Sequence, residues 1–148
     1  MTTQTKYFGE LEYTEEEIIT FPKGLYGFED ENSFLLLPFS KDNTLFSLQS
    51  LKTPSLSFVL VDPFSVKPDY APVLQVGELK ELGVEDSREL FVYALCAVKE
   101  PVGNSTLNLC CPVVINDNRR AMQVILEDSP YGMRHLLSDV ERQEAGSC

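Results

Sequence analysis

The sequence predicts a mostly β protein, a single-domain antiparallel β-barrel-like fold with one or two short helices. Two observations predict this class. The apolar runs have the length of strands and are separated by turn-forming residues, and one segment alone has convincing helical spacing. At 148 residues, 43% of them apolar, the chain is long enough to bury a core. We expect one domain over residues 1–148, ending in a polar, flexible tail at about 138–148.

The strands follow from the alternation of apolar and polar side chains. Residues 6–13 (KYFGELEY) alternate, with Tyr7 and Leu11 on one face and Glu10 and Glu12 on the other, and predict the first strand. Further strands are expected at residues 45–51, 56–64, 90–98, 107–115 and 121–127.

The segment 121–127 (AMQVILE) has the pattern of a half-buried strand. Its alternation places Met122, Val124 and Leu126 toward the core. The same alternation directs Gln123 and Glu127 toward water.

A hairpin turn and a helix complete the predicted elements. Residues 115–122 (INDNRRAM) predict a turn, because Asn and Asp tolerate left-handed backbone conformations. Residues 76–83 (VGELKELG) predict the helix, with Leu79 and Leu82 three positions apart and Gly83 placed to end it.

The segment FPKGLYGFE at residues 21–29 is open to three interpretations. A phosphate loop would need a lysine and a hydroxyl directly after the second glycine, whereas Gly27 is followed by aromatic and acidic residues. A tight turn would give Gly24 and Gly27 positive φ angles and leave the aromatic rings over the edge of the core. The sequence favours the turn, and a turn that carries Tyr26 and Phe28 could also contact a partner.

The charge of the chain limits its partners. It has 23 acidic and 12 basic residues, a net charge of −11, which repels nucleic acid and anionic membranes and favours basic proteins. We expect no direct nucleic-acid binding and no membrane association. The first residues contain no apolar signal region, and no apolar run could span a bilayer. A cytoplasmic protein with reduced thiols is expected.

Catalytic and metal-binding patterns are weak. The four cysteines, Cys96, Cys110, Cys111 and Cys148, lack zinc-like or disulfide-like spacing, and a regular strand would direct the two adjacent thiols to opposite faces. We expect no catalytic residues, no cofactor and no metal site. Two alternatives stay open: a β-barrel that binds a small ligand, and a hydrolase that pairs Cys110 or Cys111 with His135.

Five strings in order resemble the family of the flagellar assembly factor FliW: FPKGLYGFE, LQSLKTPSLSFVLVDPF, PDY, LNLCCPVVIN and QVILEDSPYGMRHLL. The resemblance extends from about Lys6 to about Leu137. It departs from the family pattern at Tyr26, where proline is common, and at the pair Cys110–Cys111, where small or aliphatic residues are expected.

The resemblance implies a cytoplasmic protein that is not an enzyme and that binds two partners. One is flagellin awaiting export, and the other is CsrA, an RNA-binding repressor of flagellin translation. Exported flagellin would leave the protein free to capture CsrA, so that flagellin translation follows flagellin export. The alternative within the family is a flagellin-binding chaperone without CsrA antagonism.

Three stretches place aromatic and acidic side chains together and are the candidates for partner binding. Prolines are expected to hold the residues 61–70 (VDPFSVKPDY) as an extended loop. In the alternative, each stretch is only structural, and Phe64 closes one end of the barrel. The candidate residues are Phe28 and Glu29; Asp62, Phe64, Asp69 and Tyr70; and Glu127, Asp128 and Tyr131.

Overall fold

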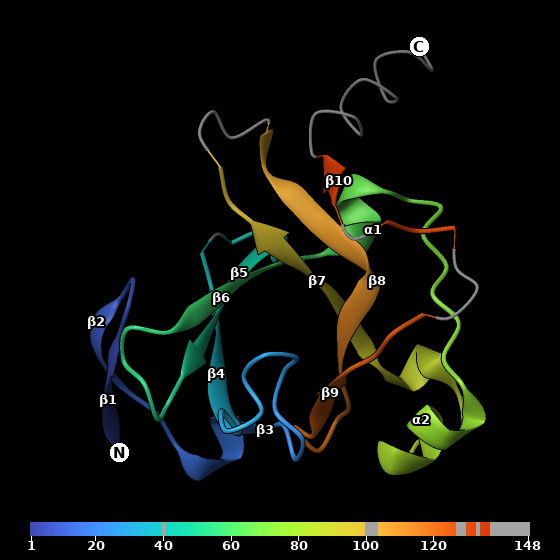
Figure 1. Cartoon of the computed structure of the whole chain (residues 1–148). Helices are drawn as coiled ribbons and strands as arrows, with labels where there is room; N and C mark the ends of the chain where they lie inside the picture. The colour runs from blue at the N-terminus through green and yellow to red at the C-terminus, as the bar shows by residue number, and fades with distance from the viewer. Residues whose placement is uncertain (40, 100–103, 127–129, 133, 137–148) are drawn as a thin grey trace.

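Antiparallel strands make up most of the regular secondary structure in the computed structural model, which describes residues 1–39, 41–99, 104–126, 130–132 and 134–136 (Figure 1). The predicted tail at 138–148 lies outside the described residues. The strands are β1 (Thr2–Thr5), β2 (Gly9–Glu12), β3 (Ile19–Thr20), β4 (Ser33–Pro38), β5 (Leu45–Ser50), β6 (Ser57–Val61), β7 (Phe91–Ala97), β8 (Thr106–Ile115), β9 (Ala121–Gln123) and β10 (His135–Leu136). The helices are α1 (Pro63–Val66) and α2 (Val76–Glu81), and single 3-10 turns lie at η1 (Glu15–Glu17) and η2 (Ser87–Glu89).

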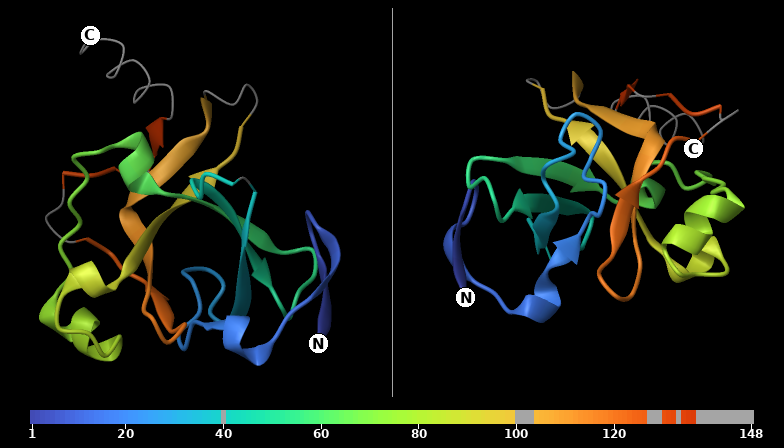
Figure 2. Two further views of the ribbon diagram at one scale, coloured as in Figure 1. Left: turned by 180° about the vertical axis from the view of Figure 1, so that it is seen from behind. Right: turned by 60° about the horizontal axis from the view of Figure 1, so that its bottom comes forward.

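One curled sheet confirms the predicted barrel-like fold. Its strands follow the order β10-β8-β7-β6-β5-β4-β3, and β9 pairs with β8. The backbone N–H of Thr20 in β3 donates to the carbonyl of Arg119 at 2.8 Å, which joins the last strand of this path to the β8–β9 hairpin. The sheet therefore nearly closes on itself, as the views in Figure 2 show.

The predicted strand at 6–13 is confirmed for Gly9–Glu12, which form β2, and is wrong for residues 6–8, which form the turn of a separate β1–β2 hairpin. The chain turns at residues 6–8 and enters β2 at Gly9, whose φ of +67° is left-handed. The Thr5 hydroxyl stabilises the turn: it accepts from the N–H of Phe8 and donates to the carbonyl of Gly9. The aromatic rings of Tyr7 and Phe8 suit either a strand or this turn.

Strand β8 divides the core into two clusters. Val113 belongs to the cluster that contains Phe21 and Phe34, and Val114 belongs to the cluster that contains Tyr70 and Leu82. Successive strand residues point to opposite faces, so both faces of β8 are covered. This explains why its sequence is an almost continuous apolar run.

A wide bulge interrupts the pairing of β8 with β7. Tyr93 pairs with Val113 and Leu95 with Asn108, so β7 advances two residues (93 to 95) while β8 advances five (108 to 113). Cys111 lies in this bulge, where burial, and secondarily the Cys110 thiol, raise the pKa of its own thiol. The two side chains therefore interact, contrary to the prediction for a regular strand.

The carbonyl groups of the bulge bind other segments of the chain. The carbonyl of Leu109 accepts from the Tyr70 hydroxyl at 2.6 Å, and that of Cys111 accepts from the amide of Gln123 at 3.2 Å. The carbonyls of Cys110 and Pro112 accept from the backbone N–H groups of residues 126 and 124, at 2.8 and 3.0 Å. The bulge is thus an anchor for the segments that follow β6 and β9.

The prediction that Gln123 faces water is wrong. Strand β9 ends at Gln123, which is 8% exposed and whose Oε1 accepts from the backbone N–H of Tyr26 at 3.0 Å. Val124 and Leu126 are buried as predicted, whereas Met122 is half-buried. Glu127 lies outside the described residues. A polar side chain faces the interior here because two backbone groups need a partner there.

The turn before β9 forms as predicted, with a different residue in the left-handed conformation. Arg119, with φ of 63°, occupies that conformation, and the asparagines and aspartate of the turn do not. Asn116 is buried instead, and its Oδ1 accepts from the N–H groups of Asn118 and Arg120, both at 2.9 Å.

The predicted helix at 76–83 is confirmed as α2, which is followed by Gly83 with φ of +68°. The expectation of an extended loop at 61–70 is wrong over its first part, because Pro63–Val66 form α1. Asp62 caps this helix by accepting from the N–H of Phe64 at 3.0 Å, and Pro63 occupies the first helical turn, where its missing N–H costs nothing.

We predict that Gln123→Leu lowers the free energy of unfolding by about 1–3 kcal/mol, because the substitution keeps the side-chain volume but leaves the Tyr26 N–H and the Cys111 carbonyl without partners. Urea unfolding followed by circular dichroism measures this change. Gln4→Leu, at an exposed position of β1, is the matched control. Equal stability of the two variants would contradict this role of Gln123.

Candidate functional site

Three aromatic rings join two of the predicted stretches. The rings of Phe64 and Tyr70 lie 5.7 Å apart, and those of Tyr70 and Tyr131 lie 4.6 Å apart in an edge-to-face arrangement. We call these three residues the Tyr70 cluster. It lies where α1, the segment after it and the segment after β9 meet, and all three predicted aromatic residues of these two stretches belong to it.

Tyr70 is the buried member of this cluster and connects it to the core. Its side chain is 3% exposed, and its hydroxyl donates to the Leu109 carbonyl in the β8 bulge. Burial, followed by the nearby Tyr131, raises the pKa of Tyr70 far above the ordinary tyrosine range. A buried ring cannot make the direct contact that the sequence suggested. Phe64, 41% exposed, is the accessible ring.

Tyr131 ties the two segments together through its hydroxyl. This oxygen accepts from the backbone N–H of Ala71 at 2.8 Å, so the segment after β9 is fixed to the segment after α1. Tyr131 itself is half-buried. The cluster therefore has one buried, one half-buried and one exposed ring.

The predicted acidic residues near this cluster have different settings. Asp62 is half-buried as the cap of α1. Asp69 is exposed and pairs with Lys67 at 3.1 Å, and the Lys67 ammonium lowers the pKa of its carboxyl. Glu127 and Asp128 lie outside the described residues.

The opening segment forms a separate surface on a tight turn. Leu25 and Phe28 exchange two backbone hydrogen bonds, at 2.7 and 3.3 Å, and Gly24 and Gly27 have φ angles of +66° and +86°. The predicted turn is confirmed. The Phe28 ring packs edge-to-face on Phe58 at 5.0 Å, and Figures 1 and 2 show this segment at the other end of the barrel from α1.

The remaining predicted residue, Glu29, serves the same turn. Its Oε1 accepts from the backbone N–H of Gly27 at 3.2 Å. Tyr26, the residue that departs from the family pattern, is 56% exposed, and its backbone N–H is the group that Gln123 binds. Phe28, 41% exposed, and Tyr26 are therefore accessible rings on a turn that is tied to the core.

Sequence reasoning missed two hollows beside Phe91. The larger, of about 490 Å³, is lined by Asn43, Phe46, Asp62, Phe64 and Leu90–Tyr93; the smaller, of about 310 Å³, is lined by Leu36, Phe91, Tyr93, Ile115, Asn116, Asp117 and Arg119. Phe91 is 55% exposed and lies in the walls of both. Phe91 and Tyr93 share one face of the predicted strand at 90–98, which was the available signal.

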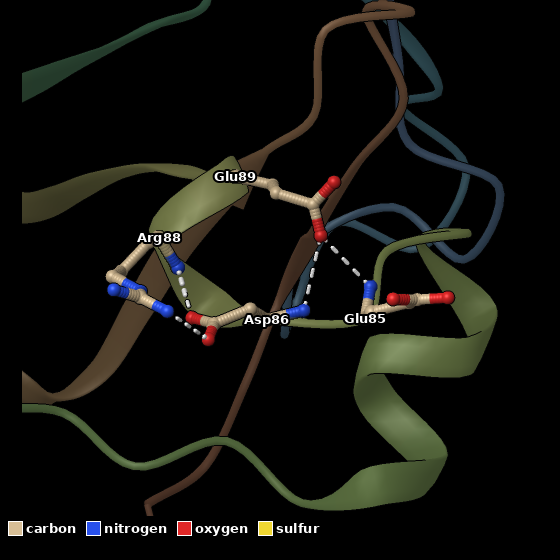
Figure 3. Close-up of polar contacts among 4 residues, drawn as sticks. All are labelled: Glu85, Asp86, Arg88 and Glu89. Atoms are coloured by element: carbon tan, nitrogen blue, oxygen red, sulfur yellow. Dashed lines mark hydrogen bonds and ion pairs between the residues drawn. The ribbon is translucent and has the colours of Figure 1, made fainter.

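An acidic turn directly precedes Phe91 in the chain. Glu89 Oε2 accepts from the backbone N–H groups of Glu85 and Asp86 at 2.9 and 3.0 Å, and Asp86 accepts from the Arg88 guanidinium at 3.0 Å (Figure 3). These carboxylates accept hydrogen bonds from backbone N–H groups at the start of η2 that would otherwise lack a partner. Part of the acidic composition therefore serves to cap short helical turns.

The thiols of Cys96 and Cys111 have no features of an activated nucleophile. Burial raises the pKa of the Cys96 and Cys111 thiols, which disfavours the reactive thiolate. Among the described residues, no hydrogen bond joins His135 to a cysteine, and no three His, Cys, Asp or Glu side chains are grouped to hold a metal ion. Within the same part of the chain, no helix has the length and apolar character needed to span a bilayer.

Comparison with known proteins gives consistent similarities over almost the whole chain. The family described as FliW protein matches residues 2–137. The flagellar assembly factor FliW of Exiguobacterium sp. is 40% identical, over 97% of this chain and 99% of that protein, and the one of Bacillus velezensis is 36% identical over 100% of both. A crystal structure of the flagellar assembly factor FliW superposes with a TM-score of 0.87 and 36% identity, over 93% of this chain and 96% of that one.

We predict that Gly24→Ala lowers the free energy of unfolding by more than Gly27→Ala does. Both residues have positive φ, which costs alanine about 1 kcal/mol. At Gly24 an added Cβ would also lie 2.5 Å from the Phe28 carbonyl oxygen, whereas at Gly27 it meets no atom within 4 Å. Thermal or urea unfolding of both variants measures the difference, and similar losses would show that the close approach at Gly24 is relieved without cost.

Proposed function

Because this chain belongs to the FliW family of flagellar assembly factors, we propose that it couples flagellin translation to flagellin export by binding two proteins in alternation. One is flagellin before export, and the other is a CsrA-type repressor of flagellin translation. The observation that carries the proposal is the family match over residues 2–137, with identities of 36–40% to relatives named as flagellar assembly factors.

Mass action between two complexes would make the exchange work. Unexported flagellin occupies this protein, so the repressor stays free and translation falls. Once flagellin is exported, the freed protein captures the repressor and translation resumes. Because the messenger RNA and unexported flagellin are both in the cytoplasm, the protein acts there and does not need to bind nucleic acid or a membrane.

The surface of the molecule supports a role in binding. A net charge of −11 complements an RNA-binding protein, which must carry a positive surface. Phe28 and Phe64 offer exposed aromatic rings on segments that are fixed by hydrogen bonds, which lowers the entropy lost on association. The raised pKa values of the Cys96 and Cys111 thiols support binding over cysteine catalysis.

Partner exchange is tested with purified proteins. We expect this protein and the CsrA-type regulator of the same genome to co-elute in size-exclusion chromatography, and added flagellin to release the regulator. Phe64→Ala is expected to weaken at least one complex about tenfold or more, because exposed aromatic anchors dominate interfaces. Val98→Ala is the matched control, because it removes exposed apolar surface directly after the last residue of β7, Ala97, and outside the candidate stretches.

Three outcomes separate the alternatives. Binding of flagellin without the regulator would identify a flagellin chaperone and contradict the exchange. Binding of neither protein would contradict the proposal as a whole and favour the small-ligand barrel. Equal losses of affinity in Phe64→Ala and Val98→Ala would show that Phe64 is not an anchor of the interface, and would leave the proposed exchange of partners intact.

The charge of the bound protein would also weaken the hold of the repressor on RNA. We expect the release of RNA from the regulator, measured by fluorescence anisotropy of labelled RNA, to diminish as salt rises from about 0.05 to 0.5 M, because screening shortens the range of charge repulsion. RNA binding by the regulator alone is measured at each salt concentration as the control. Release that does not depend on salt would leave a purely conformational coupling.

A further inference from the structure

The larger hollow beside Phe91 has the walls of a site for a cationic side chain. Four aromatic rings line it, those of Phe46, Phe64, Phe91 and Tyr93, together with the single acidic side chain of Asp62. Among the described residues, no lysine or arginine lines this hollow, whose volume is about 490 Å³. Aromatic faces attract cations, and a carboxylate beside them adds charge attraction.

Asp62 is placed to receive a cation. Its Oδ1 accepts from the N–H of Phe64 as the cap of α1, which fixes the carboxylate of this lining residue. Within the described part of the chain, Asp62 takes part in no ion pair. The carboxylate is half-buried, so its charge is less screened than that of an exposed residue.

The aromatic walls are partly fixed and partly exposed. Phe46 and Tyr93 pack edge-to-face at 5.2 Å, and Phe46 is buried, whereas Phe64 and Phe91 are 41% and 55% exposed. Tyr93 is half-buried and lines both hollows.

A positive charge acts on Tyr93, whose ring lines both hollows. Burial raises the pKa of Tyr93 first, Asp62 raises it further, and Arg119 lowers it. Arg119 lines the smaller hollow together with Asp117. The larger hollow therefore keeps its negative character.

We propose that the hollow between Phe64 and Phe91 binds an arginine side chain of a partner protein. The aliphatic stem and planar guanidinium of arginine pack on the rings, and its N–H groups donate to the free oxygen of Asp62. Arginine fits better than lysine because its guanidinium stacks on aromatic faces and is less strongly hydrated. This inference rests on the proposed function insofar as the partner is a protein with a basic segment, and it adds the chemistry that the surface recognises.

The test uses a defined probe on the full chain. The N-acetylated, C-amidated peptide alanine-leucine-arginine-leucine-alanine is titrated against the ¹⁵N-labelled protein, followed by ¹⁵N–¹H correlation spectra. The same peptide with citrulline in place of arginine keeps the shape and removes the charge. We expect shifts centred on Phe64 and Phe91–Tyr93, and a Kd that is weaker by about fivefold for the citrulline peptide.

Two variants locate the interaction. Asp62→Asn keeps the helix cap, because Asn caps as well as Asp, and is expected to remove the preference for arginine over citrulline. Phe91→Ala is expected to weaken both peptides. Glu10→Gln removes one exposed carboxylate of β2, outside the hollow, and is expected to change neither Kd.

The outcomes distinguish this inference from the proposed function. Equal affinity for the two peptides, shifts away from Phe91, or the same loss in Glu10→Gln as in Asp62→Asn would overturn the arginine site. None of these results would bear on whether the protein co-elutes with flagellin or with the regulator. Peptide binding with the expected preference, together with no co-elution of either protein, would support the site and contradict the proposed function.

Discussion

Short strands joined by long irregular segments leave many backbone groups without a ladder partner, and each must find one inside a folded protein. The bulge of β8 meets much of this need. Over residues 109–112 its carbonyls point away from the β7 ladder and accept from Tyr70, Gln123 and the backbone after β9. Because Gln123 also accepts from Tyr26, the opening turn is connected to the same place.

These hydrogen bonds connect surfaces that are far apart in the sequence to one part of the fold. The Tyr70 cluster is held from below by the hydroxyl of Tyr70, and the opening turn is held through Gln123. A second buried amide does the same for the β1–β2 hairpin: Gln49 accepts from the N–H of Lys6 and donates to the carbonyls of Ser50, Pro54 and Leu56. Surfaces that are ordered before binding lose less entropy when a partner docks.

The sequence predicts the long apolar strands well, because burial on both faces of β8 leaves a continuous apolar run that is visible in the letters. It fails where two structures suit the same residues. Tyr7 and Phe8 alternate like strand residues, yet they form a turn and pack with Phe39 at 5.3 Å. Gln123 is polar and suggests a solvent face, yet it is buried because the bulge needs a donor.

The candidate surface was predictable to a similar degree. Aromatic and acidic residues close in sequence predict a contact surface around Phe64, but only the fold shows that Tyr70 is buried beneath it. The hollow beside Phe91 could not be derived from local pattern, because its walls come from β5, β7 and α1 with their adjoining residues. Long-range pairing of strands determines such a site, and no short window of sequence contains it.

The measurement that tests the central claim most directly is native-state hydrogen exchange of the amides that donate to the carbonyls of the bulge and to the side chain of Gln123. We expect the N–H groups of Val124, Leu126 and Tyr26 to exchange only with openings of nearly the full unfolding free energy, as the amides of the β7–β8 ladder do. Exchange of these three amides at rates typical of exposed loops, with the ladder still protected, would contradict the account.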